Sequence, residues 1–262
     1  MSVSVIERLN WFNRKERDHL AKLAYCGSSR LELSAKFRSD LESVLGPASI
    51  KIPEDDGVFF GMDYHLNWLF CAIWASHKLP DENSAYENPQ GYWRLPKRRK
   101  KKDEKTVVVH DTVRLLEQNQ EDVDFIVAFH QPSDNRLKVI LIEAKLDTGW
   151  DSVQFARKVG RIDNISRACK QAGFDPCIDW SIVLLSPTRP TKEQLKLPVK
   201  AKEPNDFSNN RLPDWVFRDG NNVDSIPHLM FNPPSPAENN GRKTVKRLGR
   251  SEPAIGYWEI EN

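Results

Sequence analysis

Two strongly apolar runs separated by a short polar turn constrain the fold of this chain more than any other feature. The first run covers residues 123–129 and the second covers residues 137–143, and the turn between them contains Pro-Ser-Asp-Asn at residues 132–135. Runs of this length, interrupted by turn-forming residues, predict two strands joined as a β-hairpin. Both faces of each run are apolar, which is typical of strands in the interior of a sheet.

Charged residues nevertheless occur at one end of this hairpin. A symmetric turn places His130 opposite Leu137, and therefore Asp124 opposite Glu143 to within one residue. Directly opposed residues share a face of the sheet, and Lys145, two residues beyond Glu143, projects to that same face. The sequence therefore predicts two carboxylates and an ammonium within side-chain reach at the end of an apolar sheet.

This group of charges suits phosphodiester hydrolysis. Mg²⁺ favours one or two carboxylates together with water and phosphate oxygens. A bound metal polarises the phosphoryl group and lowers the pKa of water, while Lys145 would orient that water or offset charge on the phosphate. The alternative is a cross-strand salt bridge on a solvated hairpin, worth roughly 1 kcal/mol or less. Because unpartnered charges are costly among apolar neighbours, a metal-binding cluster of Asp124, Glu143 and Lys145 explains them better.

A helix and a further strand are expected after the hairpin. The helix runs from about Ser152 to Ala172 and is capped by Asp151 or by Ser152 itself. Residues 180–185 (Trp-Ser-Ile-Val-Leu-Leu) form the next strand, reached through a right-handed crossover.

One stripe of this expected helix carries polar residues. Gln154, in the first turn, would point toward the charged cluster, and Lys158 and Arg161 would contact a phosphate backbone. A solvated amphipathic face explains Arg161 equally well.

Asp124, the Glu143-x-Lys145 step and Gln154 together resemble the motif of the PD-(D/E)xK nuclease superfamily, whose members have the restriction-endonuclease-like fold. The resemblance covers the middle third of the chain. It implies an α/β fold with a mixed central sheet flanked by helices, built from a helix, the hairpin, a crossover helix and a further strand. It also implies that Asp124 and Glu143 are metal ligands, that Lys145 is the catalytic lysine and that Gln154 is a helper on the crossover helix.

Two positions in this assignment stay open. Asp122 lies two residues before Asp124, on the same face, and is the alternative metal ligand. The acid that the family often takes from its first helix has two candidates, Asp63 and Glu117.

The N-terminal region, residues 1–78, is expected to be helical. Helical spacing within residues 5–45 puts Leu20 and Leu23 on a buried stripe. A second helix, from about Gly61 to His77, is apolar enough to pack beneath the sheet and is the candidate first core helix. Asp63 would lie in its first turn, where the helix dipole favours any acid, so capping explains Asp63 better than catalysis.

Residues 79–105 break the helical pattern and are expected to form a basic loop insertion. Tyr92, Trp93 and Arg94 precede its basic run, and basic residues interleaved with aromatic ones hold phosphates and stack on bases. Nucleic-acid contact is therefore favoured over a merely solvated loop, and a nuclear-localisation signal is a weaker alternative. The basic run consists of Lys97, Arg98, Arg99, Lys100, Lys101 and Lys102.

The nuclease-like core is expected to cover residues 106–187, with its first strand at residues 106–110. Residues 188–262 are expected to form a C-terminal extension with proline-rich and basic segments. Within that extension, residues 232–253 resemble a linker and residues 255–260 an edge strand.

Composition narrows the class of protein. The 262 residues suffice for one large domain or two small ones, and 39% hydrophobic residues with a mean hydropathy of −0.61 indicate a soluble globular chain. The first residues lack the basic start and apolar stretch of a signal peptide, so a cytoplasmic location is expected. The four cysteines are scattered without a CxxC pair, which favours free thiols over a zinc site or disulfides. No GxSxG, Walker or GxGxxG motif is present, which argues against α/β-hydrolase, NTPase and Rossmann functions.

The sequence thus predicts an α/β protein that acts as a Mg²⁺-dependent (endo)nuclease, with Mn²⁺ as a substitute metal. DNA is the favoured substrate, and RNA is the alternative, although a net charge of +2 does not by itself imply a polyanionic partner. A second hypothesis is a non-catalytic nucleic-acid-binding module on a nuclease-like fold. A third is a structural protein whose charged cluster is a salt-bridge network, which predicts no divalent-metal binding.

Overall fold

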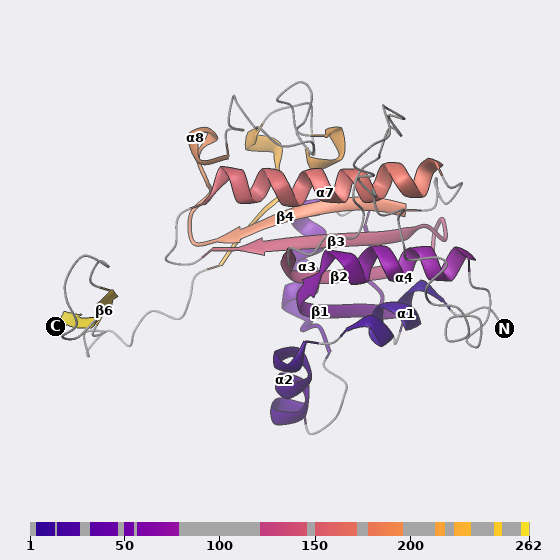
Figure 1. The fold of residues 1–262 in the computed structure, drawn as a ribbon, viewed down its shortest axis with the longest axis horizontal. Helices are drawn as coiled ribbons and strands as arrows, with labels where there is room; N and C mark the ends of the chain where they lie inside the picture. The colour runs from indigo at the N-terminus through magenta and orange to yellow at the C-terminus, as the bar shows by residue number, and fades with distance from the viewer. Residues whose placement is uncertain are drawn as a thin grey trace, which may run out of the picture. The chain divides into compact units, whose positions relative to one another are not determined.

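A computed structural model describes residues 4–13, 15–26, 32–46, 50–54, 57–78, 121–145, 150–171, 178–195, 213–217, 223–231, 244–247 and 258–261. The chain divides into two compact units, Met1–Met230 and Phe231–Asn262. The first unit contains a five-stranded sheet and the second a two-stranded sheet (Figure 1).

The five-stranded sheet is mixed, and its strands lie side by side in chain order. The first three strands pair antiparallel, and the last three pair parallel, so the third strand belongs to both halves. This arrangement confirms the predicted α/β class with a mixed central sheet. The strands are β1 (Val58–His65), β2 (Asp122–His130), β3 (Leu137–Ala144), β4 (Ile178–Ser186) and β5 (His228–Met230).

The hairpin of β2 and β3 has the register that its sequence predicts. His130 pairs with Leu137 and Phe125 with Ile142, so that Asp124 and Glu143 are the next opposed residues. The turn closes with Asn135 at a φ of 54°, in the left-handed region that asparagine tolerates better than most residues.

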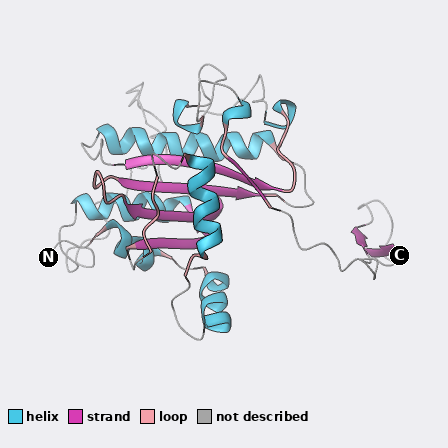
Figure 2. Cartoon of the chain, turned by 180° about the vertical axis from the view of Figure 1, so that it is seen from behind, coloured by secondary structure: helices cyan, strands magenta, loops and turns pink. Residues whose placement is uncertain are grey.

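Helices cover both faces of the sheet. On one face lie α1 (Val5–Phe12), α4 (Leu66–Lys78) and α7 (Ser152–Gln171), which are in front in Figure 1. On the other face lies α3 (Ala35–Leu45), which crosses the strands in the reverse view of Figure 2. The central strands are therefore buried on both sides, as their continuous apolar sequence predicts.

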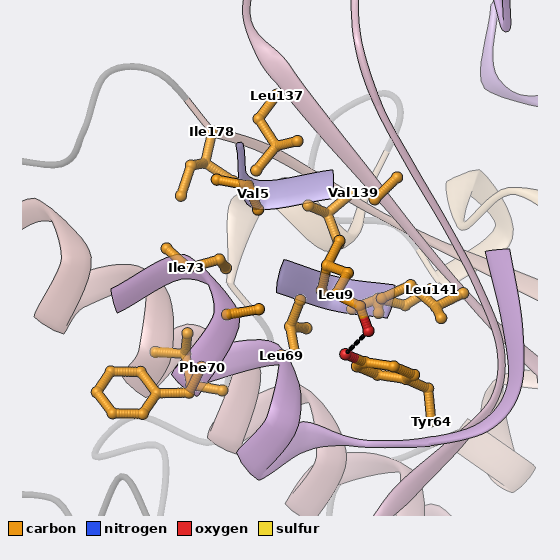
Figure 3. Close-up of a cluster of buried hydrophobic side chains, with 14 of the residues drawn as sticks. Val5, Leu9, Tyr64, Leu69, Phe70, Ile73, Leu137, Val139, Leu141 and Ile178 are labelled. Carbon is orange, nitrogen blue, oxygen red and sulfur yellow. Dashed lines mark hydrogen bonds between the residues drawn. The ribbon is translucent and has the colours of Figure 1, made fainter. Parts of the chain in front are cut away.

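The core between the sheet and the first helical layer is built from all three helices. Leu9 of α1 and Leu69 of α4 are fully buried against Val139 and Leu141 of β3 (Figure 3). The hydroxyl of Tyr64 in β1 donates to the carbonyl of Leu9 at 2.9 Å, which satisfies a polar group inside this core. Burying each such aliphatic side chain stabilises the fold by about 1.5–3 kcal/mol.

The core on the α3 side uses the alternate residues of the same strands. Val127 and Phe129 of β2 and Ile140 of β3 are fully buried there, together with Leu41 of α3. Because side chains alternate along a strand, this second core leaves Asp124 and Glu143 on the face that α1, α4 and α7 cover.

The crossover after the hairpin has the predicted order. Helix α7 connects β3 to β4, which pairs parallel with β3 from Leu137–Ile178 to Ala144–Leu185. The observed helix and strand therefore agree with the expected helix from Ser152 and the expected strand at residues 180–185.

The helix predicted from Gly61 to His77 is wrong at its N-terminal end. Residues from Val58 to His65 form β1, which pairs antiparallel with β2, and the helix begins only at Leu66. Helical periodicity is a local signal, whereas β1 forms because β2 offers it a partner 60 residues later in the chain. Asp63 consequently lies in a strand rather than in a helix cap, with a φ of 48° and an ion pair of 3.6 Å to Arg17.

The buried stripe predicted for the second N-terminal helix is also wrong. In α2 (Glu16–Cys26), Leu20 and Leu23 are each 64% exposed, whereas Asp18 and Lys22 are buried. Asp18 accepts hydrogen bonds from the Asn13 side chain at 2.7 Å and from the backbone of β1, and it pairs with Lys22 at 2.7 Å. Polar contacts therefore attach this helix to β1.

Several predicted segments lie outside the described residues, among them the basic run at 97–102, the strand at 106–110 and Glu117. Within the second unit, β6 (Thr244–Arg247) pairs antiparallel with β7 (Trp258–Glu261). A strand thus occurs inside the stretch expected to be a linker, and the expected C-terminal edge strand pairs with it. Among the described residues, no helix has both the length and the apolar character that a membrane span requires.

Candidate functional site

Asp124 and Glu143 lie at the open end of the β2–β3 hairpin, beneath α7. Asp124 is half-buried, and its Oδ2 accepts a hydrogen bond of 2.7 Å from the backbone N–H of Ala144. This bond attaches the carboxylate of β2 to the last residue of β3. It fixes the position of Asp124 beside Glu143 and leaves Oδ1 of Asp124 for a further contact.

Glu143 is almost completely buried and forms an ion pair with a lysine from the crossover helix. Its Oε1 and Oε2 accept hydrogen bonds of 2.6 and 2.7 Å from the Nζ of Lys158. The exposed fractions are 3% for Glu143 and 5% for Lys158. The pair is thus a buried salt bridge between the sheet and α7, in which one ammonium contacts both carboxylate oxygens.

The surroundings make Glu143 a weaker acid than an ordinary glutamate. Burial raises the pKa of Glu143 to about 7, and the neighbouring carboxylate of Asp124 acts in the same direction. The charges of Lys158 and Lys145 oppose this rise in the pKa but do not cancel it. The four groups therefore form one electrostatic cluster of two carboxylates and two ammonium groups.

Lys145 follows the last residue of β3 and is half-buried. Its backbone N–H donates to the carbonyl of Leu185 at 2.8 Å, which continues the parallel pairing one residue beyond the strand. Its charge lowers the pKa of Glu143, which places the two groups within electrostatic reach. The structure thus brings together Asp124, Glu143 and Lys145, the three residues that the sequence groups.

Asp122, the alternative ligand, has a different neighbour. It forms an ion pair with Lys15, at the start of the N-terminal helical region, and it lies opposite His65 of β1. The Asp122 carboxylate is therefore held toward β1, whereas Asp124 is held toward Glu143. This geometry favours Asp124 as the partner of Glu143.

The polar stripe predicted on α7 is corrected by the structure. Lys158 and Arg161 are buried rather than turned to solvent, and Gln154 is exposed. The guanidinium of Arg161 donates to the side chain of Asn67 in α4 and lies 3.9 Å from the carboxylate of Glu121. As the structure stands, Lys158 and Arg161 connect α7 to the sheet and to α4, and neither presents its charge to an external phosphate.

A serine and a histidine that sequence reasoning did not single out lie at the same edge of the sheet. Ser186 ends β4, and its Oγ lies 3.0 Å from Nε2 of His228 in β5. Both residues are buried, and the serine hydroxyl donates to the carbonyl of Thr188 at 2.7 Å. The available signal was that carboxyl ends of parallel strands meet at one edge, but the pairing of β5 with β4 was not predictable.

The chemistry of the cluster fits a hard divalent cation with few protein ligands. Among the described residues, no group of three or more histidine, cysteine, aspartate and glutamate side chains is placed to hold a metal. Asp63 lies across from Asp124 in the strand register, but its carboxylate is paired with Arg17. Two carboxylates remain, Asp124 and Glu143, which is the number that Mg²⁺ commonly takes from a protein when water and phosphate complete its shell.

Comparison of this chain with protein-family models, with curated proteins and with solved structures finds no significant match to any of them.

Proposed function

We propose that this protein is a Mg²⁺-dependent nuclease that hydrolyses phosphodiester bonds of DNA at Asp124, Glu143 and Lys145. The observation that carries the proposal is the hairpin register, since Phe125 pairs with Ile142 and the next opposed residues are the two carboxylates. A glutamate buried to 3% exposure at the end of an apolar strand is costly to keep. A catalytic role gives a reason for that cost.

The arrangement of elements supports the same proposal. A hairpin that carries the acid and the Glu-x-Lys step, followed by a crossover helix and a parallel strand, is the order that the resemblance to PD-(D/E)xK nucleases implies. We therefore propose a restriction-endonuclease-like fold for the first unit. In this assignment β1 is the outer strand of the hairpin sheet, and α7 is the crossover helix.

Each group of the cluster has a defined part in hydrolysis. Bound Mg²⁺ supplies a Lewis acid for the phosphoryl oxygens and a more acidic water. Asp124 and Glu143 hold the cation through one carboxylate oxygen or more each. Lys145, at the mouth of the site, orients the attacking water by hydrogen bonding and offsets the negative charge that develops on the phosphate. Gln154, exposed in the first turn of α7, contacts the substrate beside them.

The direct test is a cleavage assay with the full chain on linear and circular DNA, with and without Mg²⁺, and with Mn²⁺ as the substitute. Metal-dependent cleavage of circular DNA supports an endonuclease, and cleavage of linear DNA alone supports an exonuclease. RNA substrates of the same length test the alternative substrate. Absence of cleavage of DNA and RNA with either metal would contradict the proposal.

One observation favours a second function, a non-catalytic nucleic-acid-binding module on the same fold. Lys158 contacts both oxygens of Glu143, as a purely structural salt bridge would. Metal titration separates the two functions, because a structural pair has no need to bind Mg²⁺ or Mn²⁺. DNA binding that is unaffected by metal, without cleavage, would favour the second function.

A further inference from the structure

The ammonium of Lys158 occupies the position from which a cation would contact Glu143. Its Nζ lies 2.6 and 2.7 Å from the two carboxylate oxygens, and both side chains are nearly inaccessible to solvent. A divalent cation held by Glu143 needs at least one of the same oxygens. Two cations on one buried carboxylate repel each other strongly, because little solvent screens them.

The neighbours of Lys158 offer no second anion that a metal would leave free. The charged groups around Glu143 are Asp124, Lys145 and Lys158, and Asp124 is the other proposed metal ligand. An ammonium displaced from Glu143 would therefore stay near the metal without a carboxylate partner. Leaving a buried charge unpaired costs several kcal/mol, so metal binding alone is opposed.

The position of Lys158 in α7 gives its side chain a way out. It lies one helical turn after Gln154, which is exposed in the first turn of the helix. Long side chains in a helix lean toward its N-terminus, so the lysine stem extends toward this exposed turn. An ammonium that leaves Glu143 in that direction reaches the place where a substrate phosphate would lie in the proposed nuclease.

We propose that Lys158 is an internal competitor for the metal site, which a divalent cation displaces from Glu143 and which then pairs with a phosphate of the substrate. The inference rests on the proposed nuclease function and adds a regulatory consequence to it. Metal and nucleic acid bind cooperatively, because each one stabilises the arrangement in which Lys158 has left Glu143. Without nucleic acid the site holds metal weakly.

The first test measures Mn²⁺ affinity by calorimetry in the full chain and in Lys158→Gln, which keeps a hydrogen-bond donor but removes the competing charge. We expect Lys158→Gln to bind Mn²⁺ at least about tenfold more tightly than the wild type in the absence of DNA. Lys158→Arg retains a cation and should bind as weakly as the wild type. Arg157→Gln, an exposed change of the same charge one residue away, is the matched control and should leave affinity unchanged.

The second test concerns cooperativity and uses a short DNA duplex in a Lys145→Ala background, so that the duplex stays intact. We expect the duplex to raise Mn²⁺ affinity at least about tenfold when Lys158 is present, and by less than half that factor in Lys158→Gln. Equal gains in the two proteins would overturn the proposed role of Lys158, since a phosphate that merely ligates the metal would help both alike.

The third test uses the wild-type protein and so does not depend on whether a variant folds. In protein with ¹⁵N-labelled lysine, the ammonium of Lys158 should give a protected signal because of its buried pair with Glu143. Saturating Mg²⁺ with the duplex should shift this signal. A signal unchanged at saturating metal, or equal Mn²⁺ affinities in wild type and Lys158→Gln, overturns the competitor while leaving the nuclease intact. If neither protein binds Mn²⁺ or Mg²⁺, the proposed metal-dependent function itself is overturned.

Discussion

The Glu143–Lys158 pair predicts how the stability of the protein responds when one or both partners are replaced. Each residue is no more than 5% exposed, so removal of either partner leaves a charge that water cannot solvate. We expect Lys158→Met alone to lower the free energy of unfolding by about 3–5 kcal/mol. Glu143→Leu combined with Lys158→Met should cost far less, because two apolar side chains then fill a space that adjoins the buried core.

The assay is equilibrium unfolding in urea, followed by tryptophan fluorescence and by circular dichroism, with midpoints compared at unchanged slope. The control is Lys36→Met, which breaks the exposed ion pair of 2.5 Å between Lys36 and Asp40 in α3. That change should cost no more than about 0.5 kcal/mol. The reasoning is refuted if Lys158→Met costs as little as the control, or if the double variant loses the sum of the two single effects.

Four further outcomes are expected. Lys145→Ala should lower the cleavage rate by about 10²-fold or more while Mg²⁺ affinity and folding are retained, because this lysine acts on water and phosphate rather than on the metal; single-turnover cleavage beside metal calorimetry measures both, and wild-type cleavage would contradict the mechanism. Asp124→Asn should weaken Mn²⁺ binding about tenfold or more, whereas Asp122→Asn, whose carboxylate pairs with Lys15, should change it little; the reverse result would make Asp122 the ligand. Replacing the basic residues at 97–102 by glutamine should weaken DNA binding at every sequence and lower the slope of log affinity against log salt by about 0.9 per lost phosphate contact, and an unchanged slope would assign binding elsewhere. Because the pKa of Glu143 is raised to about 7, the folded protein holds a proton that the unfolded chain releases near pH 4.5, so this group's contribution to stability is greatest below pH 4.5 and falls as the pH rises to about 7; urea midpoints across this range should show the fall in wild type and lack it in Glu143→Gln.

Local signals were sufficient for the part of the fold that carries the candidate site. A turn of four residues between two apolar runs determined the hairpin and its register, since a slip of one residue would move every apolar side chain to the other face. The same reasoning placed Asp124 opposite Glu143 before any tertiary contact was known. The helix after residue 151 and the strand at 180–185 followed from capping and periodicity, which are also local.

Errors occurred where a distant partner decides the conformation. Gly61 to His65 has apolar residues compatible with a helix, yet it forms a strand because β2 pairs with it along seven positions. Leu20 and Leu23 have helical spacing, yet they are exposed because α2 attaches to β1 through Asp18 instead of through its leucines. Periodicity identifies an apolar stripe but does not identify what covers it.

The sequence by itself therefore determined the hairpin, the crossover and the grouping of two carboxylates with Lys145. Only the tertiary structure decided that Lys158 contacts Glu143, that Arg161 is buried against α4, and that Asp122 pairs with Lys15. The physical reason is that strand register depends on side chains near one another in the chain, within one turn and its flanking residues. The partner of a buried charge depends instead on how α7 and the N-terminal helices pack on the sheet, and residues far apart in sequence fix that packing.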